Sequence, residues 1–317
     1  MHRRTTLTLA AALTALVLAG CSAQPEGAGT SSPSSSSGGC SGTGIATSAS
    51  TEAAALVPAG VKSAGKIKIG TDPTLPPYEF TDEDDELTGL DVELGKLIGC
   101  KLGLGVDYTT IDFAGLLTAV QAGRYDMAIA GISDTAEREQ VLDLVDYQTE
   151  GTSIIVKSGN PDKISSIDDL CGKKVAAAQG SVPLELLTRK NKDCAKPISI
   201  LSLPTSSDAF LAVRSGRADA SMETLGTAVY YQKTEKGGSA LQALTSNLYA
   251  QGYQSIAFPK NAKSGSLRDA VKAALTDLIA DGSYEKLYKK WGLTANMVKE
   301  ITVNDAQRFA DDYYNVG

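Results

Sequence analysis

The sequence predicts an α/β protein of two similar lobes that face each other across a cleft. Over about residues 66–317, short β-like runs alternate with stretches of helical periodicity, the pattern of sheets covered by helices. The alternation occurs twice, first over 66–151 and then over 152–252. A length of about 250 residues favours more than one compact core. Two α/β lobes are therefore the expected architecture.

The first lobe begins with Lys66–Gly70, where charged and apolar residues alternate as in a strand with one buried face. A helix is predicted over 90–102, because apolar residues recur there at helical spacing. The elements that follow are a strand over 106–111, a helix over 113–122, a strand over 127–130 and a helix that includes Arg138.

The second lobe repeats this alternation. Its predicted strands and helices are 175–178, 184–190, 198–203, 208–215, 218–222 and 225–232.

The rest of the chain, 253–317, is assigned to the first lobe and contains predicted helices over 267–278 and 284–291. The chain then crosses between the lobes near 147–153 and near 249–254. Two such crossings form a hinge. Ligands usually bind in a cleft of this kind, close to the carboxyl ends of the strands.

The N-terminus predicts export and a lipid anchor. Residues 1–20 combine a short basic start with an apolar stretch that is too short to span a membrane comfortably, as in a secretory signal peptide. The Leu-Ala-Gly-Cys sequence that ends at Cys21 resembles a bacterial lipobox, in which cleavage leaves Cys21 as the lipid attachment site. The protein is therefore expected on the extracellular face of the cell membrane, held there by lipid.

Residues 21–60 are expected to form a flexible tether between the anchor and the folded body. The part from Ser22 to about Ser50 consists mainly of Ser, Gly, Thr and Ala. It has too few large apolar residues to offset the entropy lost on ordering.

Composition excludes several kinds of chemistry. The only histidine is His2, which lies in the signal peptide, so histidine-based catalysis and histidine metal sites are excluded from the mature chain. A net charge of −7 with interspersed acids and bases argues against nucleic acid as a partner. The acidic run 82–86 lacks the ligand spacing of a calcium loop and is expected at a solvated hairpin tip. No catalytic residue, metal or cofactor is expected.

The cysteines fit an oxidising compartment. Cys171 and Cys194 are expected to form a disulfide, with two buried thiols as the alternative. Cys40 and Cys100 are each either free or joined in a long-range bridge, and the sequence does not decide between these states.

The stretch 130–138 carries the features of a carboxylate-binding turn. Gly131 permits close approach of a ligand, Asp134 or Thr135 can cap the next helix, and Arg138 can add a bidentate guanidinium. The alternative is an ordinary helix cap beside a solvated arginine.

Further ligand-type residues follow other predicted strands. These are Asp72, Ser133, Gly180, Ser181 and Glu223. A zwitterion would suit them, with its carboxylate on the arginine and its ammonium group on one of the acids.

From Lys66 to about Leu293 the chain resembles the family 3 extracellular solute-binding proteins, the polar amino-acid receptors of ABC importers. The matching stretches are Gly70-Thr71-Asp72, Pro77-Tyr78-Glu79-Phe80, Gly89 to Leu94, Asp112-Phe113, Gly131-Ile132-Ser133 with Glu137-Arg138, Gly216 to Ala220, and Gly282-Ser283-Tyr284 with Lys289-Lys290-Trp291. The resemblance implies a periplasmic-binding-protein-like fold, with a ligand in the cleft between two lobes joined by a two-strand hinge.

The resemblance also implies roles for single residues. Arg138 would clamp the ligand carboxylate with the help of Ser133 and the backbone at Gly131 and Ser181. The full set of expected ligand contacts is Asp72, Leu75, Tyr78, Phe113, Gly131, Ile132, Ser133, Arg138, Gly180, Ser181, Val182 and Glu223.

Four residues depart from the family pattern. Leu75 stands where many members have an aromatic ring, and Glu223 stands where an aspartate usually holds the ammonium group. Val182, with Pro183 after it, makes the wall of the second lobe more apolar. The identity of the amino acid therefore stays open at this point.

The expected function is the capture of a polar amino acid or related zwitterion by lobe closure, for delivery to the permease and ATPase subunits of an ABC importer. The protein would act as a monomer and perform no chemistry. The alternatives are an enzyme similar to cyclohexadienyl dehydratases that uses Glu223 as general acid, a ligand sensor for a signalling receptor, and an opine or compatible-solute receptor.

Overall fold

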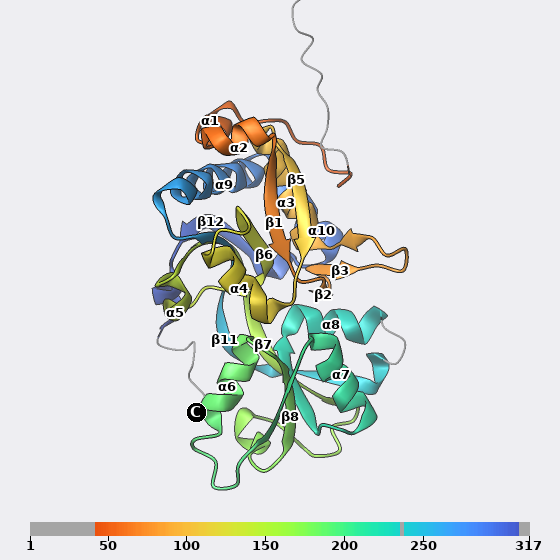
Figure 1. The fold of residues 1–317 in the computed structure, drawn as a ribbon. Coiled ribbons are helices and arrows are strands. Elements are labelled where there is room, and N and C mark those ends of the chain that lie inside the picture. The colour runs from red at the N-terminus through yellow and green to blue at the C-terminus, as the bar shows by residue number, and fades with distance from the viewer. Residues whose placement is uncertain (1–41, 235–237, 311–317) are drawn as a thin grey trace, which may run out of the picture. The chain divides into compact units, whose positions relative to one another are not determined.

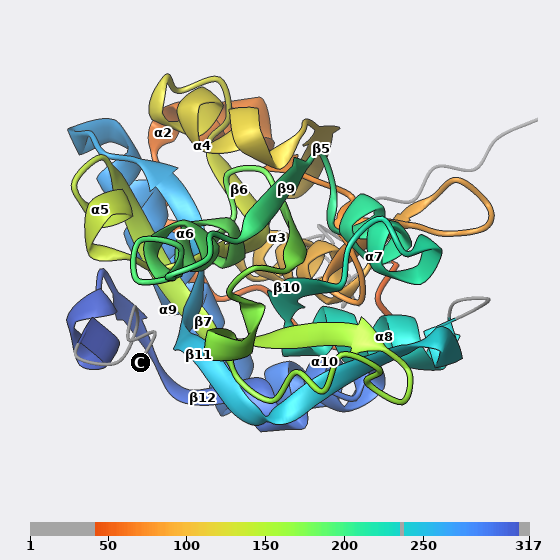
Figure 2. The same ribbon diagram turned by 90° about the horizontal axis from the view of Figure 1, so that it is seen from below.

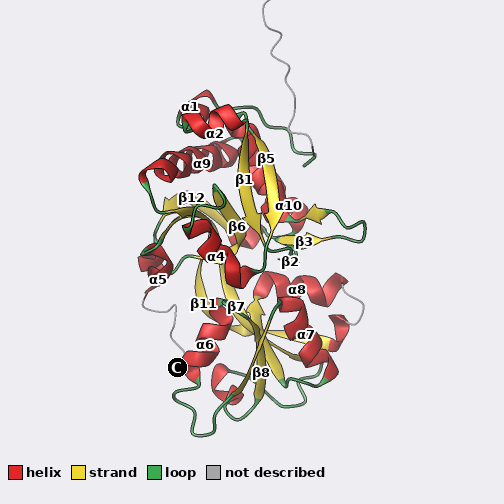
Figure 3. Cartoon of the chain, viewed as in Figure 1, coloured by secondary structure: helices red, strands yellow, loops and turns green. Residues whose placement is uncertain are grey.

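The computed structural model describes residues 42–234 and 238–310, and all of them belong to the compact unit formed by residues 38–317. This unit has the predicted α/β fold with two lobes, shown in Figure 1 and, by secondary structure, in Figure 3. The described residues form one large mixed sheet with the strand order β5-β1-β6-β11-β7-β10-β8-β9, and β12 also pairs with β7. The ends of this sheet lie in different lobes, with β5 in the upper part of Figure 1 and β8 in the lower part. Figure 2 is the view from below, in which the lobe that contains β9 and β10 is nearer the viewer.

Lobe 1 contains a parallel arrangement of three strands covered by helices. The strands are β1 (Lys66–Thr71), β5 (Gly105–Thr110) and β6 (Met127–Ser133). The helices are α3 (Leu90–Leu102), α4 (Phe113–Gln121), the single turn α5 (Ala136–Glu139), α9 (Ala262–Ala280) and α10 (Ser283–Trp291).

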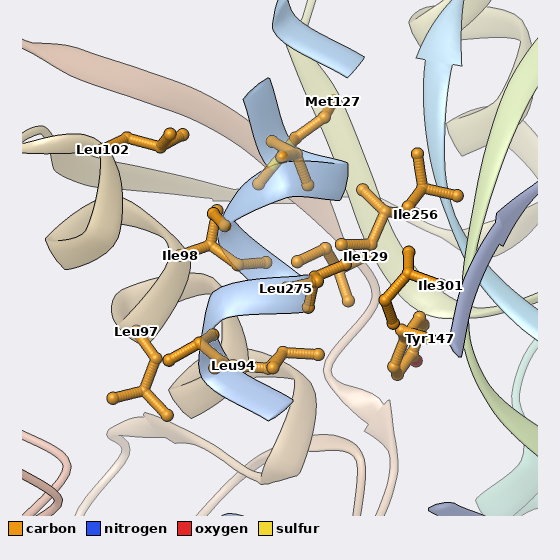
Figure 4. Packing of buried hydrophobic residues seen from close by; sticks show 14 of the residues in the cluster. Leu94, Leu97, Ile98, Leu102, Met127, Ile129, Tyr147, Ile256, Leu275 and Ile301 are labelled. Atoms are coloured by element: carbon orange, nitrogen blue, oxygen red, sulfur yellow. The ribbon is translucent and has the colours of Figure 1, made fainter. Parts of the chain in front are cut away.

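The core of lobe 1 forms where α3 and α9 meet β1 and β6. Leu94, Ile98, Ile129 and Leu275 are completely buried there, and Figure 4 shows them interlocking. The apolar spacing seen in the sequence thus places the buried faces of α3 and α9 against each other and against the sheet.

Lobe 2 has the same alternation of strands and helices as lobe 1. Its strands are β8 (Lys174–Ala178), β9 (Ser199–Leu203) and β10 (Ala220–Thr224), and its helices are α6 (Val182–Lys190), α7 (Ser206–Ser215) and α8 (Leu225–Thr234). Strand β8 pairs in parallel with both β9 and β10.

Two long antiparallel strands, β7 (Leu142–Lys157) and β11 (Leu241–Pro259), run through both lobes. Their pairing shifts register between Leu244 and Tyr249, between Tyr249 and Gly252, and between Gln254 and Ser255. These irregularities fall at the predicted crossings, where a regular ladder would hold the strands straight. The crossings are therefore the hinge.

The small elements complete the fold. A three-stranded sheet in lobe 1 consists of β2 (Thr74–Leu75), β3 (Glu79–Thr81) and β4 (Leu87–Thr88). The acidic run 82–86 is the turn of the β3–β4 hairpin, and Asp82 Oδ1 accepts hydrogen bonds from the backbone of Asp84 and Glu86. The short 3-10 helices are η1 (Ile167–Leu170), η2 (Gly238–Ala240), η3 (Thr294–Asn296) and η4 (Ala306–Phe309).

The packed part of the chain begins earlier than the tether boundary near residue 60 that composition suggested. Helices α1 (Thr51–Ala55) and α2 (Ala59–Ala64) lie on lobe 1, where Ala53 and Val61 join its core. Ile45 is buried there as well, and Thr47 donates a hydrogen bond of 2.6 Å to Asp281. Small residues contribute to a core when a neighbouring helix covers them, which a composition count does not detect.

Two further differences concern the ends of elements, and a third is an additional strand. Strand β6 continues to Ser133, which leaves α5 as one turn instead of a full helix. Strand β10 includes Glu223 instead of ending before it. Strand β12 (Met297–Val303), which pairs with β7, was not predicted.

Cys171 and Cys194 form the predicted disulfide. Cys100 is also disulfide-bonded, and its partner lies outside the described residues. The predicted signal peptide and the predicted lipid attachment site, Cys21, lie outside the described residues too. In the part of the chain that the structure describes, no helix is both long and apolar enough to cross a membrane.

Candidate functional site

A cavity lies between the two lobes and is lined by both. It has a volume of about 50 Å³. The lining residues come from the ends of strands and from the turns that follow them: Asp72, Thr74, Leu75, Glu79, Phe113, Ala130, Gly131, Ser133, Arg138, Ala178, Ser181, Val182, Pro183, Pro204, Ser206, Glu223 and Thr224.

Arg138 extends from α5 across the cavity. The Thr135 hydroxyl caps α5 by accepting a hydrogen bond of 3.2 Å from the Arg138 backbone. The guanidinium donates to Ser133 O at 2.8 Å and, across the lobe boundary, to Gly180 O at 3.4 Å. Its central carbon also lies 5.8 Å from the centre of the Phe113 ring. Because α5 is a single turn, the guanidinium is the main source of positive charge here.

Gly131 has a positive φ of +54°, and a Cβ at this position would overlap the Leu75 side chain. Its N–H donates to Asp91 Oδ2 at 3.2 Å, a buried carboxylate that also accepts from the Tyr147 hydroxyl. The Gly131 N–H is therefore engaged within the protein in this structure. The glycine permits tight packing against Leu75.

Ser181 is the N-cap of α6. Its hydroxyl accepts from Leu184 N at 3.3 Å and donates to Ala178 O at 2.7 Å. Its backbone N–H also donates to Ala178 O, at 3.3 Å.

Asp72 is buried at the end of β1 and orients the Phe113 wall. Its Oδ2 accepts a hydrogen bond of 2.9 Å from Phe113 N, the first residue of α4. Burial raises the pKa of the Asp72 carboxyl, and the bond from Phe113 opposes that shift.

Glu223 lies within β10 of lobe 2 and is 4% exposed. Its Oε1 accepts from Thr224 N at 2.8 Å. Burial raises the pKa of Glu223, while hydrogen bonds from Ser206 and Thr224 oppose the shift.

Glu79 is the lining residue of most consequence that the site prediction missed. It is completely buried, and its carboxyl oxygens accept no hydrogen bond from a protein donor. Burial raises its pKa well above the ordinary value, and the nearby carboxyls of Asp91, Asp72 and Glu223 raise it further. The neutral form of Glu79 is therefore favoured beside the Asp91 carboxyl.

The other predicted contacts divide into two groups. Leu75 and Val182 line the cavity as expected. Tyr78, Ile132 and Gly180 do not line it. Tyr78 and Ile132 are fully buried in the core of lobe 1, and Gly180 contributes its carbonyl oxygen to Arg138.

The cavity therefore holds one guanidinium and three carboxyl groups, those of Asp72, Glu79 and Glu223. Such a site can pair one anionic group and more than one cationic group. Over residues 42–234 and 238–310, no group of three or more His, Cys, Asp or Glu side chains is arranged to hold a metal ion.

Comparison with known proteins agrees with this geometry. An arginine-binding protein of Corynebacterium glutamicum is 27% identical over 259 residues, which cover 80% of this chain and 83% of that protein. A probable amino-acid-binding protein of Bacillus subtilis is 33% identical over 218 residues, which cover 68% of this chain and 80% of that protein.

Solved structures show the same fold. An ancestral arginine-binding protein bound to arginine is 34% identical, with a TM-score of 0.67, and the match covers 72% of this chain and 98% of that chain. An ancestral amino acid-binding protein, a precursor of cyclohexadienyl dehydratase, is 30% identical, with a TM-score of 0.64 and coverage of 73% and 97%.

The profile of one family matches residues 67–294, which include both lobes and the hinge. Together with the two-lobed fold and its central cavity, this match shows that the chain belongs to the bacterial extracellular solute-binding proteins, family 3.

Proposed function

We propose that this protein captures an α-amino acid with a positively charged side chain. The observation that carries the proposal is the charge of the cavity, where three carboxyl groups surround a space with one guanidinium. A neutral amino acid brings one positive and one negative group, and would leave the cavity with an excess of acids. A basic amino acid brings a second positive group.

The ligand would lie with its carboxylate on Arg138 and its ammonium group on Glu223 of lobe 2. The side-chain cation would then be directed toward Asp72 and Glu79. Leu75, in place of an aromatic ring, makes charge more important than stacking at this end. The relatives named as arginine-binding proteins support this class of ligand.

Capture would proceed by closure of the lobes about the β7–β11 hinge. A ligand that contacts Arg138 on one lobe and Glu223 on the other stabilises the closed arrangement through its differential affinity. The closed form would deliver the ligand to the permease and ATPase subunits of an ABC importer. A monomer anchored through lipid on Cys21, outside the cell, fits this role.

One observation favours an enzymatic alternative. Glu223 is a buried acid with a raised pKa, as a general acid requires, and one structural relative is the precursor of a dehydratase. The arginine-binding and amino-acid-binding names of the relatives favour binding without turnover. Release of product from prephenate or arogenate, assayed with the purified protein, would favour the enzyme.

A ligand panel tests the proposal. Arginine, lysine and ornithine should raise the melting temperature of the protein, since a ligand at 100 times its Kd adds about 2.7 kcal/mol to the free energy of unfolding. Glutamine and citrulline, which match these ligands in size and lack the side-chain charge, serve as controls. A larger shift with the neutral pair than with the basic amino acids would refute the charge assignment.

A further inference from the structure

Helix α8 of lobe 2 rests against one short segment of lobe 1, residues 78–80, next to the ligand cavity. Gly226 and Tyr230 lie one turn apart on the same face of α8. The Tyr230 ring lies 5.5 Å from the Phe80 ring, at an angle of 51°. Gly226 lies against Tyr78. Two residues of α8 thus meet two residues of this segment.

The contact at Gly226 leaves no space for a side chain. A Cβ at this position would lie 3.0 Å from Glu150 Oε2 and from the Tyr78 ring carbon that carries the hydroxyl, and closer still to that hydroxyl oxygen. The backbone of α8 can therefore approach lobe 1 this closely only because the residue is glycine.

Glu150 connects the two lobes at this point. It lies on hinge strand β7, accepts a hydrogen bond from the Tyr78 hydroxyl of lobe 1, and lies against Gly226 in the first turn of α8. Asn296, also of lobe 1, donates to the same carboxylate at 3.1 Å. A carboxylate at the start of a helix also interacts favourably with the helix dipole.

The contact separates two cavities. The ligand cavity lies on one side and is lined by Glu79, the residue between Tyr78 and Phe80. A groove of about 510 Å³ lies along the hinge on the other side, and Glu150, Gly226 and Tyr230 line it. Residues 78 and 80 thus face α8 while residue 79 faces the ligand site, as the alternation of an extended segment requires.

We propose that Tyr78, Glu150 and Gly226 form a latch that stabilises the closed lobes and so sets ligand affinity without contacting the ligand. The proposal rests on capture by lobe closure, the function proposed above. Rotation about the hinge moves α8 relative to residues 78–80, and separation would break the packing of Gly226 against Tyr78 and Glu150. Tyr78 and Glu150 are positioning residues in this scheme, which gives Tyr78 a role away from the cavity wall.

A double-mutant cycle tests the latch. Gly226→Ala should weaken binding of the best ligand from the panel about tenfold, through faster dissociation, because the added methyl group keeps α8 from docking. Tyr78→Phe, which keeps the ring and removes the hydroxyl, should weaken binding about threefold. In the Tyr78→Phe background, Gly226→Ala should weaken binding by much less than tenfold, because the hydroxyl group nearest to the added methyl group is gone. The ranking of ligands should not change.

Gly60→Ala is the matched control, since Gly60 lies in α2 with no atom within 4 Å of a built Cβ. It should leave affinity unchanged. The latch would be overturned if Gly226→Ala lowered ligand affinity equally in the wild-type and Tyr78→Phe proteins. A change in the ranking of ligands would overturn it as well. If the Gly226→Ala variant does not fold, the test rests on Tyr78→Phe alone. An unchanged rate of ligand dissociation from that variant would then overturn the latch.

A second measurement separates this proposal from the ligand assignment. Dyes attached through non-natural amino acids at the exposed positions Asp84 in lobe 1 and Lys192 in lobe 2 report lobe separation by energy transfer. In ligand-free protein, Gly226→Ala should lengthen the mean dye distance relative to wild type and Gly60→Ala. This result is expected even if no amino acid binds. An unchanged distance would refute the latch and leave the ligand assignment standing.

Discussion

The two walls of the ligand cavity differ in chemistry. Lobe 1 supplies Asp72, Glu79 and Arg138, whereas the described lining residues of lobe 2 include one ionisable side chain, that of Glu223. The rest of the lobe 2 wall is small, apolar or hydroxylic, with Ala178, Ser181, Val182, Pro183, Pro204, Ser206 and Thr224. The two walls therefore differ mainly in the number of charged side chains that they carry.

This asymmetry has a physical consequence for the order of events. A charged ligand in an open cleft gains most of its specific interactions on lobe 1, where both signs of charge are present. Closure of lobe 2 then removes water, which strengthens every ion pair inside the cavity. Substitutions on lobe 1 should therefore affect binding more than substitutions on lobe 2.

The largest effect is expected from Arg138→Ala. Loss of the guanidinium leaves the ligand carboxylate without its partner, which costs about 2–5 kcal/mol and weakens binding by at least about thirtyfold in calorimetric titration. Arg189→Ala is the control. Arg189 pairs with Glu137 across the lobes at 3.5 Å in an exposed position, so its loss should change affinity less than threefold or so. Equal losses would contradict a special role for Arg138.

The second largest effect on ligand binding is expected from Glu79→Gln. The amide keeps the size of the side chain and removes only its charge, so the fold should persist. Arginine affinity should fall about tenfold, while binding of a neutral analogue such as citrulline should hold or improve. The ratio of the two Kd values is the measurement. An unchanged ratio would assign Glu79 a purely structural role with Asp91.

The carboxyl groups of the cavity also predict that ligand affinity depends on pH. The pKa values of Asp72, Glu79 and Glu223 are all raised in the ligand-free protein. A cationic ligand favours their ionised forms, so binding should release protons, and affinity should increase as pH rises through these raised pKa values. Titration calorimetry in two buffers of different ionisation enthalpy measures the protons released. Proton uptake would contradict the charge assignment.

The stability of the ligand-free protein should change in the opposite sense. A carboxyl with a raised folded-state pKa binds more protons in the folded state than in the unfolded state. Its contribution therefore falls as pH rises from the ordinary carboxyl range to the raised pKa. Melting curves over this interval should show ligand-free stability falling while ligand affinity grows, and Glu79→Gln should reduce both trends.

The smallest effect on binding is expected on lobe 2, from Ser181→Ala. Loss of the α6 cap should lower the free energy of unfolding by about 1 kcal/mol. Ligand affinity should change less than about threefold, because the hydroxyl is engaged with Ala178 and Leu184. Ser50→Ala removes the matching cap of α1, far from the cavity, and is the control. A loss of affinity as large as that of Arg138→Ala would contradict the comparison of the walls.

Much of the fold follows from local patterns in the sequence. The helices α3 and α10 and the strands β1, β8 and β9 are close to their predicted bounds, because their apolar spacing matches the buried faces that they present. Strand β12 was missed, since its pairing with β7 joins residues far apart in the chain. Helices α1 and α2 were missed because each buries a single residue, which is too few to show a helical period in the sequence.

The sequence places candidate ligand contacts at polar and charged residues that follow predicted strands. Asp72, Ser133, Arg138 and Glu223 all line the cavity, because the ends of neighbouring strands meet there. Glu79 could have been found from the Tyr78-Glu79-Phe80 alternation, in which one polar residue faces away from two aromatic ones. Tyr78 was assigned to the cavity from the quoted motif alone, and that motif does not show which way its side chain points.

By itself, the sequence determined the α/β architecture, the two lobes, the position of the hinge and the arginine turn, because periodicity and strand-end chemistry are local properties. Only the tertiary structure decided which charges face one another. Burial of Glu79 beside Asp91, the occupied Gly131 N–H, and the docking of α8 on Tyr78 join residues distant in sequence. Desolvation and close packing act through space, so no local pattern records them.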